Sequence, residues 1–125
     1  MSVVLDTNAL MMPVECDVRV FEELDRLVGE AELVVPAAVL AELRDLAEGA
    51  GAEATAASVG LDLAQRCTVR ETDAEYADDA VVALAQADDV THVVTNDEPL
   101  GGRLRDAGVS VIRLRGQHKL DITRP

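Results

Sequence analysis

The chain has 125 residues, of which 49% are hydrophobic and only 2% aromatic. This length suits one domain, 1–125, with a core of Val, Leu, Ala and Ile, and it is too short for two ordinary domains. The scarcity of aromatic residues argues against a protein that holds single-stranded nucleic acid by stacking bases on aromatic platforms.

The charge is strongly negative, with 11 basic against 24 acidic residues and a net charge of −13. An acidic surface with a single Lys fits a salt-rich cytosol, and therefore a halophile. The segment 101–125 differs, because it holds six basic residues against two acidic ones, a local charge of +4. Such asymmetry is expected where an acidic protein must hold a polyanion.

The start of the chain argues for a cytoplasmic protein without a membrane partner. Asp6 interrupts the first apolar run, which disfavours a signal peptide, and the longest apolar run, 33–41, is far shorter than a membrane span.

Short apolar runs alternate with segments of helical spacing along the whole chain. In chain order, the expected elements are strand 3–5, helix 17–28, strand 33–35, helix 37–48, helix 53–66, strand 67–70, helix 75–86, strand 92–95, helix 99–107 and strand 109–114. Asp17 is expected to cap the first helix, and Pro36 suits the first turn of the second. Continuous apolar strands that alternate with helices indicate a parallel sheet covered on both faces. The predicted fold is therefore α/β, a three-layer α/β/α arrangement with a central parallel sheet of about five strands.

Acidic residues follow the strands of this sheet at the edge where ligands bind. Asp6 ends the first strand, and Asp97 follows the fourth strand by one Asn. Glu42 lies about one and a half turns inside the second helix, and Asp78 and Asp79 open the fourth. Because ligand sites of open α/β sheets lie at the carboxyl ends of the strands, we expect these acids to converge.

Converging carboxylates repel one another, and a divalent cation relieves that repulsion. Mg²⁺ and Mn²⁺ prefer oxygen ligands and can activate a water molecule for attack on a phosphate. The sequence has no His or Cys residues at ligand spacing, which argues against zinc.

Each acid also has a purely structural interpretation. Asp6, Asp97 and one of the pair Asp78 and Asp79 are suitable helix N-caps, and Glu42 could point to solvent. These interpretations explain each acid separately, but they do not explain why all of them are expected at one edge.

Four segments in this order resemble a PIN-domain nuclease over essentially the whole chain. The matching segments are Val4-Leu5-Asp6-Thr7-Asn8, Val39-Leu40-Ala41-Glu42-Leu43, Tyr76-Ala77-Asp78-Asp79-Ala80-Val81 and Val94-Thr95-Asn96-Asp97-Glu98-Pro99-Leu100. The resemblance implies a PIN-like fold and a Mg²⁺- or Mn²⁺-dependent endoribonuclease that hydrolyses RNA phosphodiester bonds. Among PIN domains, 104–115 and 76–79 look most like the archaeal branch that processes small-subunit ribosomal RNA precursors.

Other functions are consistent with the same segments. A VapC-type toxin ribonuclease with an antitoxin partner is the nearest alternative within the family. A PIN-like module that binds RNA or a protein without cleaving RNA is the alternative outside the enzymes. A receiver-like signalling domain fits less well, because the lysine expected before its last strand is missing and the only Lys is Lys119.

The resemblance also assigns roles to residues. It implies that Asp6, Glu42, Asp79 and Asp97 are the catalytic, metal-binding acids, with Asp78 as an adjacent contributor. Asn8 and Thr95 would orient these acids by hydrogen bonds, and the resemblance is consistent with a homodimer. From the basic segment, the candidate phosphate contacts are Arg103, Arg105, Arg113, Arg115 and Lys119.

Overall fold

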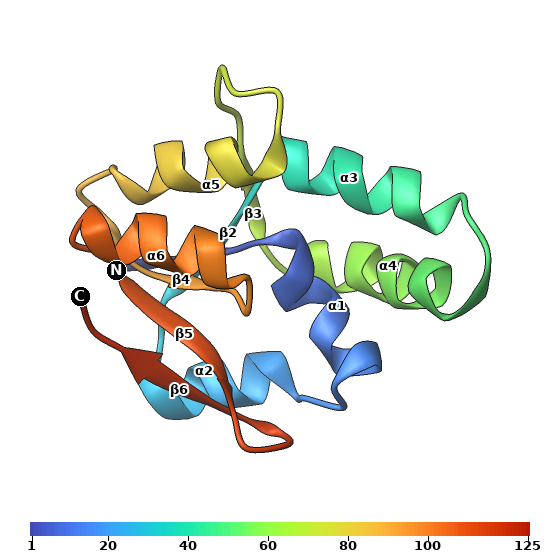
Figure 1. The fold of residues 1–125 in the computed structure, drawn as a ribbon, viewed down its shortest axis with the longest axis horizontal. Coiled ribbons are helices and arrows are strands. Elements are labelled where there is room, and N and C mark those ends of the chain that lie inside the picture. Colours follow the sequence, from blue (N-terminus) through green and yellow to red (C-terminus); the bar gives the residue numbers. More distant parts are fainter.

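The computed structural model describes residues 1–125 as one six-stranded sheet flanked by helices (Figure 1). The strands are β1 (Ser2–Leu5), β2 (Glu32–Pro36), β3 (Thr68–Arg70), β4 (Val90–Val94), β5 (Ser110–Arg115) and β6 (Lys119–Thr123). The helices are α1 (Thr7–Glu15), α2 (Val20–Val28), α3 (Ala37–Ala47), α4 (Gly51–Ala64), α5 (Ala77–Ala85) and α6 (Glu98–Asp106). None of these helices is both long and apolar enough to cross a lipid bilayer.

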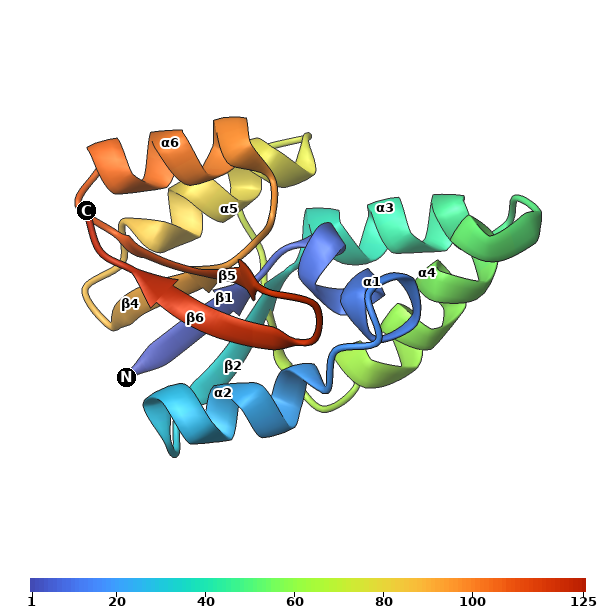
Figure 2. The same ribbon diagram turned by 60° about the horizontal axis from the view of Figure 1, so that its bottom comes forward.

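The strand order is β3-β2-β1-β4-β5-β6, and β1 lies in the middle of the sheet. All neighbouring pairs are parallel except β5 and β6, which are antiparallel. Helices α5 and α6 cover one face, and α1 and α2 cover the other (Figure 2). Helices α3 and α4 pack against each other and against α1. The structure thus confirms the predicted three-layer α/β/α architecture, with a mixed sheet of six strands in place of a parallel sheet of about five.

Two elements were not expected from the sequence. The segment after β1 is helix α1, which forms despite an internal Pro13, a residue that normally disfavours a helix. Burial of Ala9, Leu10 and Met12 together with capping by Asp6 outweighs that penalty. The tail is not a plain basic segment, because residues 119–123 form the edge strand β6.

The start of α2 also differs from expectation. The helix begins at Val20 and its N-cap is Arg19, which makes no capping hydrogen bond through its side chain. Asp17 lies in the preceding loop with a φ angle of 51°, a left-handed conformation that is compatible with a turn and not with an N-cap.

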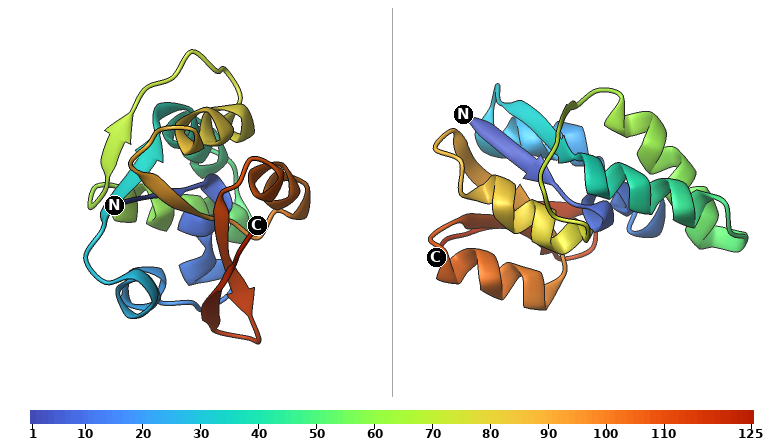
Figure 3. Two further views of the ribbon diagram at one scale, coloured as in Figure 1. Left: turned by 90° about the vertical axis from the view of Figure 1, so that its left-hand side faces the viewer. Right: turned by 90° about the horizontal axis from the view of Figure 1, so that it is seen from above.

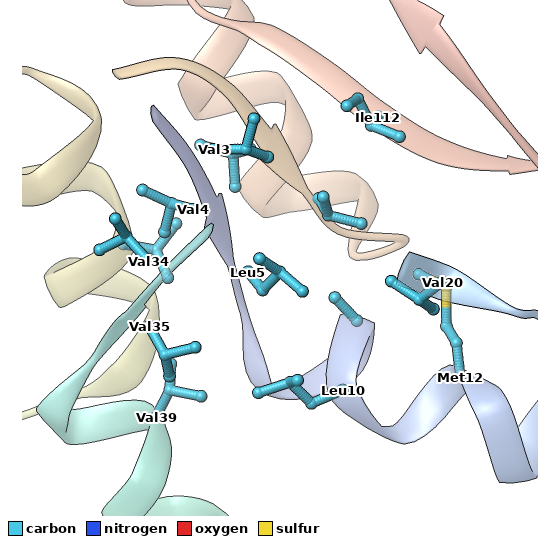
Figure 4. Close-up of a cluster of buried hydrophobic side chains, with 14 of the residues drawn as sticks. Val3, Val4, Leu5, Leu10, Met12, Val20, Val34, Val35, Val39 and Ile112 are labelled. Carbon is cyan, nitrogen blue, oxygen red and sulfur yellow. The ribbon is translucent and has the colours of Figure 1, made fainter. Parts of the chain in front are cut away.

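The central strand β1 is buried on both faces. Val3, Val4 and Leu5 are all fully buried, and they belong to one cluster of 30 buried hydrophobic residues shown in part in Figure 4. Helix α1 adds Leu10 and Met12 to the same cluster. This double burial explains why β1 is a continuous apolar run, and it holds the carboxyl end of β1 in a rigid setting.

An ion pair on α2 protects the open edge of the sheet at β6. Arg26 Nη2 lies 2.8 Å from Glu23 Oε1, and the same Glu23 oxygen accepts the Leu120 N–H at 3.0 Å. Arg26 donates to the Leu120 carbonyl at 2.8 Å. The two side chains therefore satisfy one residue of the edge strand as a neighbouring strand would, which limits unwanted pairing there.

Helices α1 and α4 approach closely at Gly60. A Cβ atom at this position would lie 2.9 Å from the Leu10 carbonyl oxygen, a backbone atom that cannot move aside cheaply. We predict that Gly60→Ala destabilises the protein by about 1–3 kcal/mol through overpacking. The measurement is the free energy of unfolding in urea.

Gly102→Ala is the matched control, because nothing lies within 4 Å of a Cβ atom at this position in α6. The higher helix propensity of Ala is expected to stabilise this variant by about 0.5–1 kcal/mol. Equal effects of the two substitutions would contradict the close approach of α1 and α4.

Candidate active site

The acidic residues predicted as a site flank the point where the strand order reverses. The neighbours β1 and β4 are followed by connections that run to opposite sides of the sheet, the position where open α/β sheets bind ligands. Asp6 follows β1, and Thr95 to Asp97 follow β4. The amino ends of α1, α3, α5 and α6 meet near the same place (Figure 3).

Asp6 is the most constrained of these acids. Its side chain is only 4% exposed, and its Oδ1 accepts the Ala9 N–H at 2.7 Å as the N-cap of α1. Its Oδ2 accepts a short hydrogen bond from the Thr95 hydroxyl. One carboxylate therefore joins the end of β1, the start of α1 and the end of β4.

The same surroundings make Asp6 an unusually weak acid. Burial is the main cause that raises the pKa of Asp6, the negative charges of Asp78 and Asp97 add to the rise, and the resulting pKa is about 7 in place of the ordinary 3.8. The hydrogen bonds from Thr95 and Ala9 oppose this rise but do not cancel it. A nearby cation would favour the charged form of this carboxyl.

Asp97 is held by two hydrogen bonds after β4. Its N–H donates to Thr95 Oγ1 at 3.0 Å, and its Oδ1 accepts the Leu100 N–H at 2.9 Å as the N-cap of α6. Thr95 thus contacts both Asp6 and the backbone of Asp97. Asp6 and Asp97 are therefore helix N-caps, as the structural interpretation predicts. Both carboxylates nevertheless still interact with other acids at this edge of the sheet.

Asn8 acts on the loop after β4 and not directly on an acid. Its Oδ1 accepts the Asn96 N–H at 2.9 Å, and the Asn96 Oδ1 accepts the Leu114 N–H at 2.7 Å. The two amides connect α1 to β5 through the loop that contains Asp97. Sequence reasoning did not single out Asn96, although it lies inside one of the four matching segments.

The two acids of α5 have different partners. Burial raises the pKa of Asp78, as do the charges of Asp97 and Glu42, while Arg103 lowers it. Asp79 forms an ion pair with Arg103 at 3.0 Å. Neither residue caps α5, whose N-cap is Tyr76. Asp78 therefore interacts with the acids from β1, α3 and β4, whereas Asp79 is neutralised at the rim.

Glu42 lies on α3 with an exposed side chain, and its charge acts on Asp78. In this arrangement no three His, Cys, Asp or Glu side chains lie close enough together to hold a metal ion. The acids that influence one another offer oxygen donors only, the donor type that suits Mg²⁺ or Mn²⁺. Their chemistry fits a hard cation, and binding one would require the side chains to move closer together.

The basic residues of the C-terminal segment are largely engaged within the chain. Arg113 pairs with Glu98 at 3.2 Å, and Arg115 pairs with Asp121 at 2.9 Å on the β5–β6 hairpin. Arg105 differs, since its Nη1 is buried without a partner. Lys119 is exposed at the start of β6. Among the five predicted phosphate contacts, Arg103 pairs with Asp79, and its charge also acts on Asp78.

The chain is similar to known proteins over nearly its whole length. A family model described as a PIN like domain matches residues 3–117. The solved structure of the PIN domain endonuclease Utp24 superimposes with a TM-score of 0.82 at 26% identity, covering 99% of this chain and 92% of that chain. A chain from the crystal structure of VapBC2 from Rickettsia felis, bound to a DNA fragment from the VapBC2 promoter, superimposes with a TM-score of 0.65 at 15% identity. The match covers 90% of this chain and 98% of that chain. No curated protein matches the chain.

The buried Asp6 carboxyl leads to a prediction about stability in metal-free buffer. Between pH about 4 and about 7 the folded protein retains a proton on Asp6 that the unfolded chain has lost, so stability falls as the pH rises through this range. At about 1.4 kcal/mol per tenfold change in proton affinity, the total loss is on the order of 4 kcal/mol.

Asp6→Asn removes this loss and keeps an efficient N-cap for α1. We therefore predict that the stability of the variant, relative to the unsubstituted protein, increases from pH 4.5 to pH 7.5 and is constant above that. Urea unfolding at each pH, with EDTA present, measures the difference. A difference that is the same at every pH would contradict the raised pKa.

Proposed function

Because the chain belongs to the PIN-like domain family, we propose that it is a metal-dependent endoribonuclease that hydrolyses RNA phosphodiester bonds in ribosomal RNA precursors. The similarity to the endonuclease Utp24 over nearly the whole of both chains supports this function. The similarity to the VapBC2 chain concerns the fold alone, so no specific observation favours a toxin with an antitoxin partner.

The observation that supports an active site most directly is the buried Asp6 carboxyl among other acids. Burial raises the pKa of this carboxyl to about 7, α1 and Thr95 fix its position, and a divalent cation beside it would stabilise its charged form. We assign Asp6, Glu42, Asp97 and an acid of α5 to Mg²⁺ or Mn²⁺. When bound, the ion lowers the pKa of a water molecule and stabilises negative charge on the phosphate.

The residues of the chain would orient the metal-binding carboxylates and contact the RNA. Asp6 and Asp97 are held at fixed positions by helix-capping hydrogen bonds, which orients their other lone pairs without further ordering. Thr95 donates to Asp6, so it keeps that carboxylate from rotating away. Arg103 lies at the rim beside Asp79, from which it would contact a neighbouring phosphate.

The proposal is tested by incubating a structured ribosomal RNA precursor fragment with the protein and Mg²⁺ or Mn²⁺. We expect endonucleolytic cleavage that EDTA abolishes, with a rate that Asp6→Asn lowers by more than about 100-fold. Substitution of a residue that only hydrogen-bonds a metal ligand already costs about 10–100-fold in activity, and loss of a ligand itself should cost more. Gel analysis of end-labelled RNA measures both.

Asp62→Asn is the matched control, because Asp62 is an exposed acid on α4 that contributes to none of the pKa shifts of Asp6 and Asp78. This variant is expected to cleave like the unsubstituted protein. Cleavage that persists in Asp6→Asn, or that needs no divalent cation, would refute the proposed mechanism.

The two acids of α5 give a separate prediction. Asp78 influences and is influenced by the other acids, whereas Asp79 is paired with Arg103. We therefore expect Asp78→Asn to lower the cleavage rate at saturating Mg²⁺ at least about tenfold more than Asp79→Asn does. The measurement is the single-turnover cleavage rate of each variant. A larger loss of rate in Asp79→Asn than in Asp78→Asn would assign the metal-binding role to Asp79, as the family resemblance does.

A further inference from the structure

One aromatic ring of the chain is open to solvent, and it belongs to Tyr76. This is the only Tyr, and its side chain is 72% exposed, more than any other large hydrophobic residue. The other aromatic residue, Phe21, is covered by Arg66, whose guanidinium lies 4.2 Å from the ring centroid. An exposed ring that packs against nothing has its face free to contact a ligand.

The backbone fixes Tyr76 at the rim of the acidic cluster. Tyr76 is the N-cap of α5, and its carbonyl oxygen accepts the Ala80 N–H at 3.0 Å. Asp78 follows two residues later, and its pKa responds to Asp97 and Glu42. The Tyr76 side chain therefore emerges within one helical turn of Asp78 and Asp79, on the helix that supplies one acid to the proposed cation site.

The charge around Tyr76 determines which part of an RNA can approach it. The preceding segment, 71–76, projects from the body of the protein (Figure 1) and contains the exposed acids Glu71, Asp73 and Glu75. Phosphate groups are repelled by these carboxylates, whereas the face of a nucleobase is uncharged. A base is thus the part of an RNA strand that can lie against this side of the site.

We propose that Tyr76 stacks on an unpaired nucleobase next to the scissile phosphate and so selects a single-stranded cleavage position. This inference rests on the proposed endoribonuclease function. Stacking on an aromatic residue contributes binding without reading the identity of the base. Bases inside a duplex are already stacked, so they are not available to the ring. One tyrosine gives one such contact, in agreement with a chain too poor in aromatic residues to bind RNA mainly by stacking.

The composition of the chain allows a direct test by fluorescence. The chain has one Tyr and no Trp, so emission in the tyrosine band reports on Tyr76 alone. The Asp6→Asn protein is titrated with a single-stranded RNA from the cleavage region, and binding is followed in parallel by the anisotropy of a labelled RNA. We expect quenching that saturates with binding and that is lost when the base at one position is replaced by an abasic residue. Binding without any change in emission would overturn the proposal.

Kinetics provides the second readout. Removing the contact in Tyr76→Ala is expected to raise KM by roughly 5- to 100-fold with kcat changed less than about twofold, and Tyr76→Phe is expected to restore KM. Val14→Ala removes a different exposed apolar side chain, 42% exposed and at the far end of α1, and should leave KM unchanged. An unchanged KM in Tyr76→Ala would overturn the stacking contact.

The two levels of the proposal fail in different ways. Quenching of Tyr76 by RNA in a protein that cleaves no RNA would refute the proposed nuclease function and support the stacking contact. Metal-dependent cleavage combined with an unquenched Tyr76 would refute the contact and leave the nuclease function in place.

Discussion

The arrangement of the site depends on one buried carboxylate. Asp6 accepts hydrogen bonds from the backbone of α1 and from Thr95, and therefore connects β1, α1 and β4 at the point where the strand order reverses. Both hydrogen bonds favour the charged form of Asp6, yet burial still keeps its pKa near 7. The fold thus holds an acid in a place where its charge is costly, a common property of catalytic sites.

The ion pairs of the C-terminal segment bear on how the proposed function would attract RNA. Most arginines of the C-terminal segment form ion pairs with exposed acids, and such surface pairs contribute about 0–1 kcal/mol each. A phosphate can therefore compete for these guanidinium groups at modest cost. Their partners Asp79 and Glu98 lie on α5 and α6, so this exchange would take place beside the proposed metal-binding acids.

The sequence predicted most of the fold because burial dictates its pattern. The whole of β1 and the carboxyl-terminal residues of β2 and β4 are buried and appear as apolar runs, which are easily recognised. Helix α1 was missed because Pro13 disfavours a helix and the polar residues after β1 also suit a turn. Its stability depends on capping by Asp6 and on burial of its apolar residues, partly against α4, which the local sequence does not reveal. Strand β6 does alternate polar and apolar residues from Lys119 to Thr123, and Gly116 supplies the positive φ of the turn, so its signal was present but weak.

The positions of the acids were predictable, but their partners were not. Asp6 and Asp97 lie directly after parallel strands, and topology alone brings such residues to one edge. Asp78 and Asp79 are adjacent on a helix and point about 100° apart, so the choice between them depends on how α5 is rotated against the sheet. That rotation is set by which side chains of α5 are buried, Ala77, Ala80, Val81, Leu84 and Ala85, and by the position of Arg103 on a different helix. No pattern within one segment contains this information.

The structural and catalytic interpretations of these acids are compatible. A carboxylate has two oxygens with two lone pairs each, and a helix cap occupies only one or two of the four. In Asp97 the cap occupies Oδ1, and in Asp6 each oxygen accepts one hydrogen bond. Capping also orients each carboxylate before any ligand arrives, so the loss of side-chain entropy has already occurred on folding. A carboxylate that caps a helix after a parallel strand can therefore also serve as a metal ligand. A sequence pattern that predicts an N-cap at such a position does not exclude metal binding by the same residue.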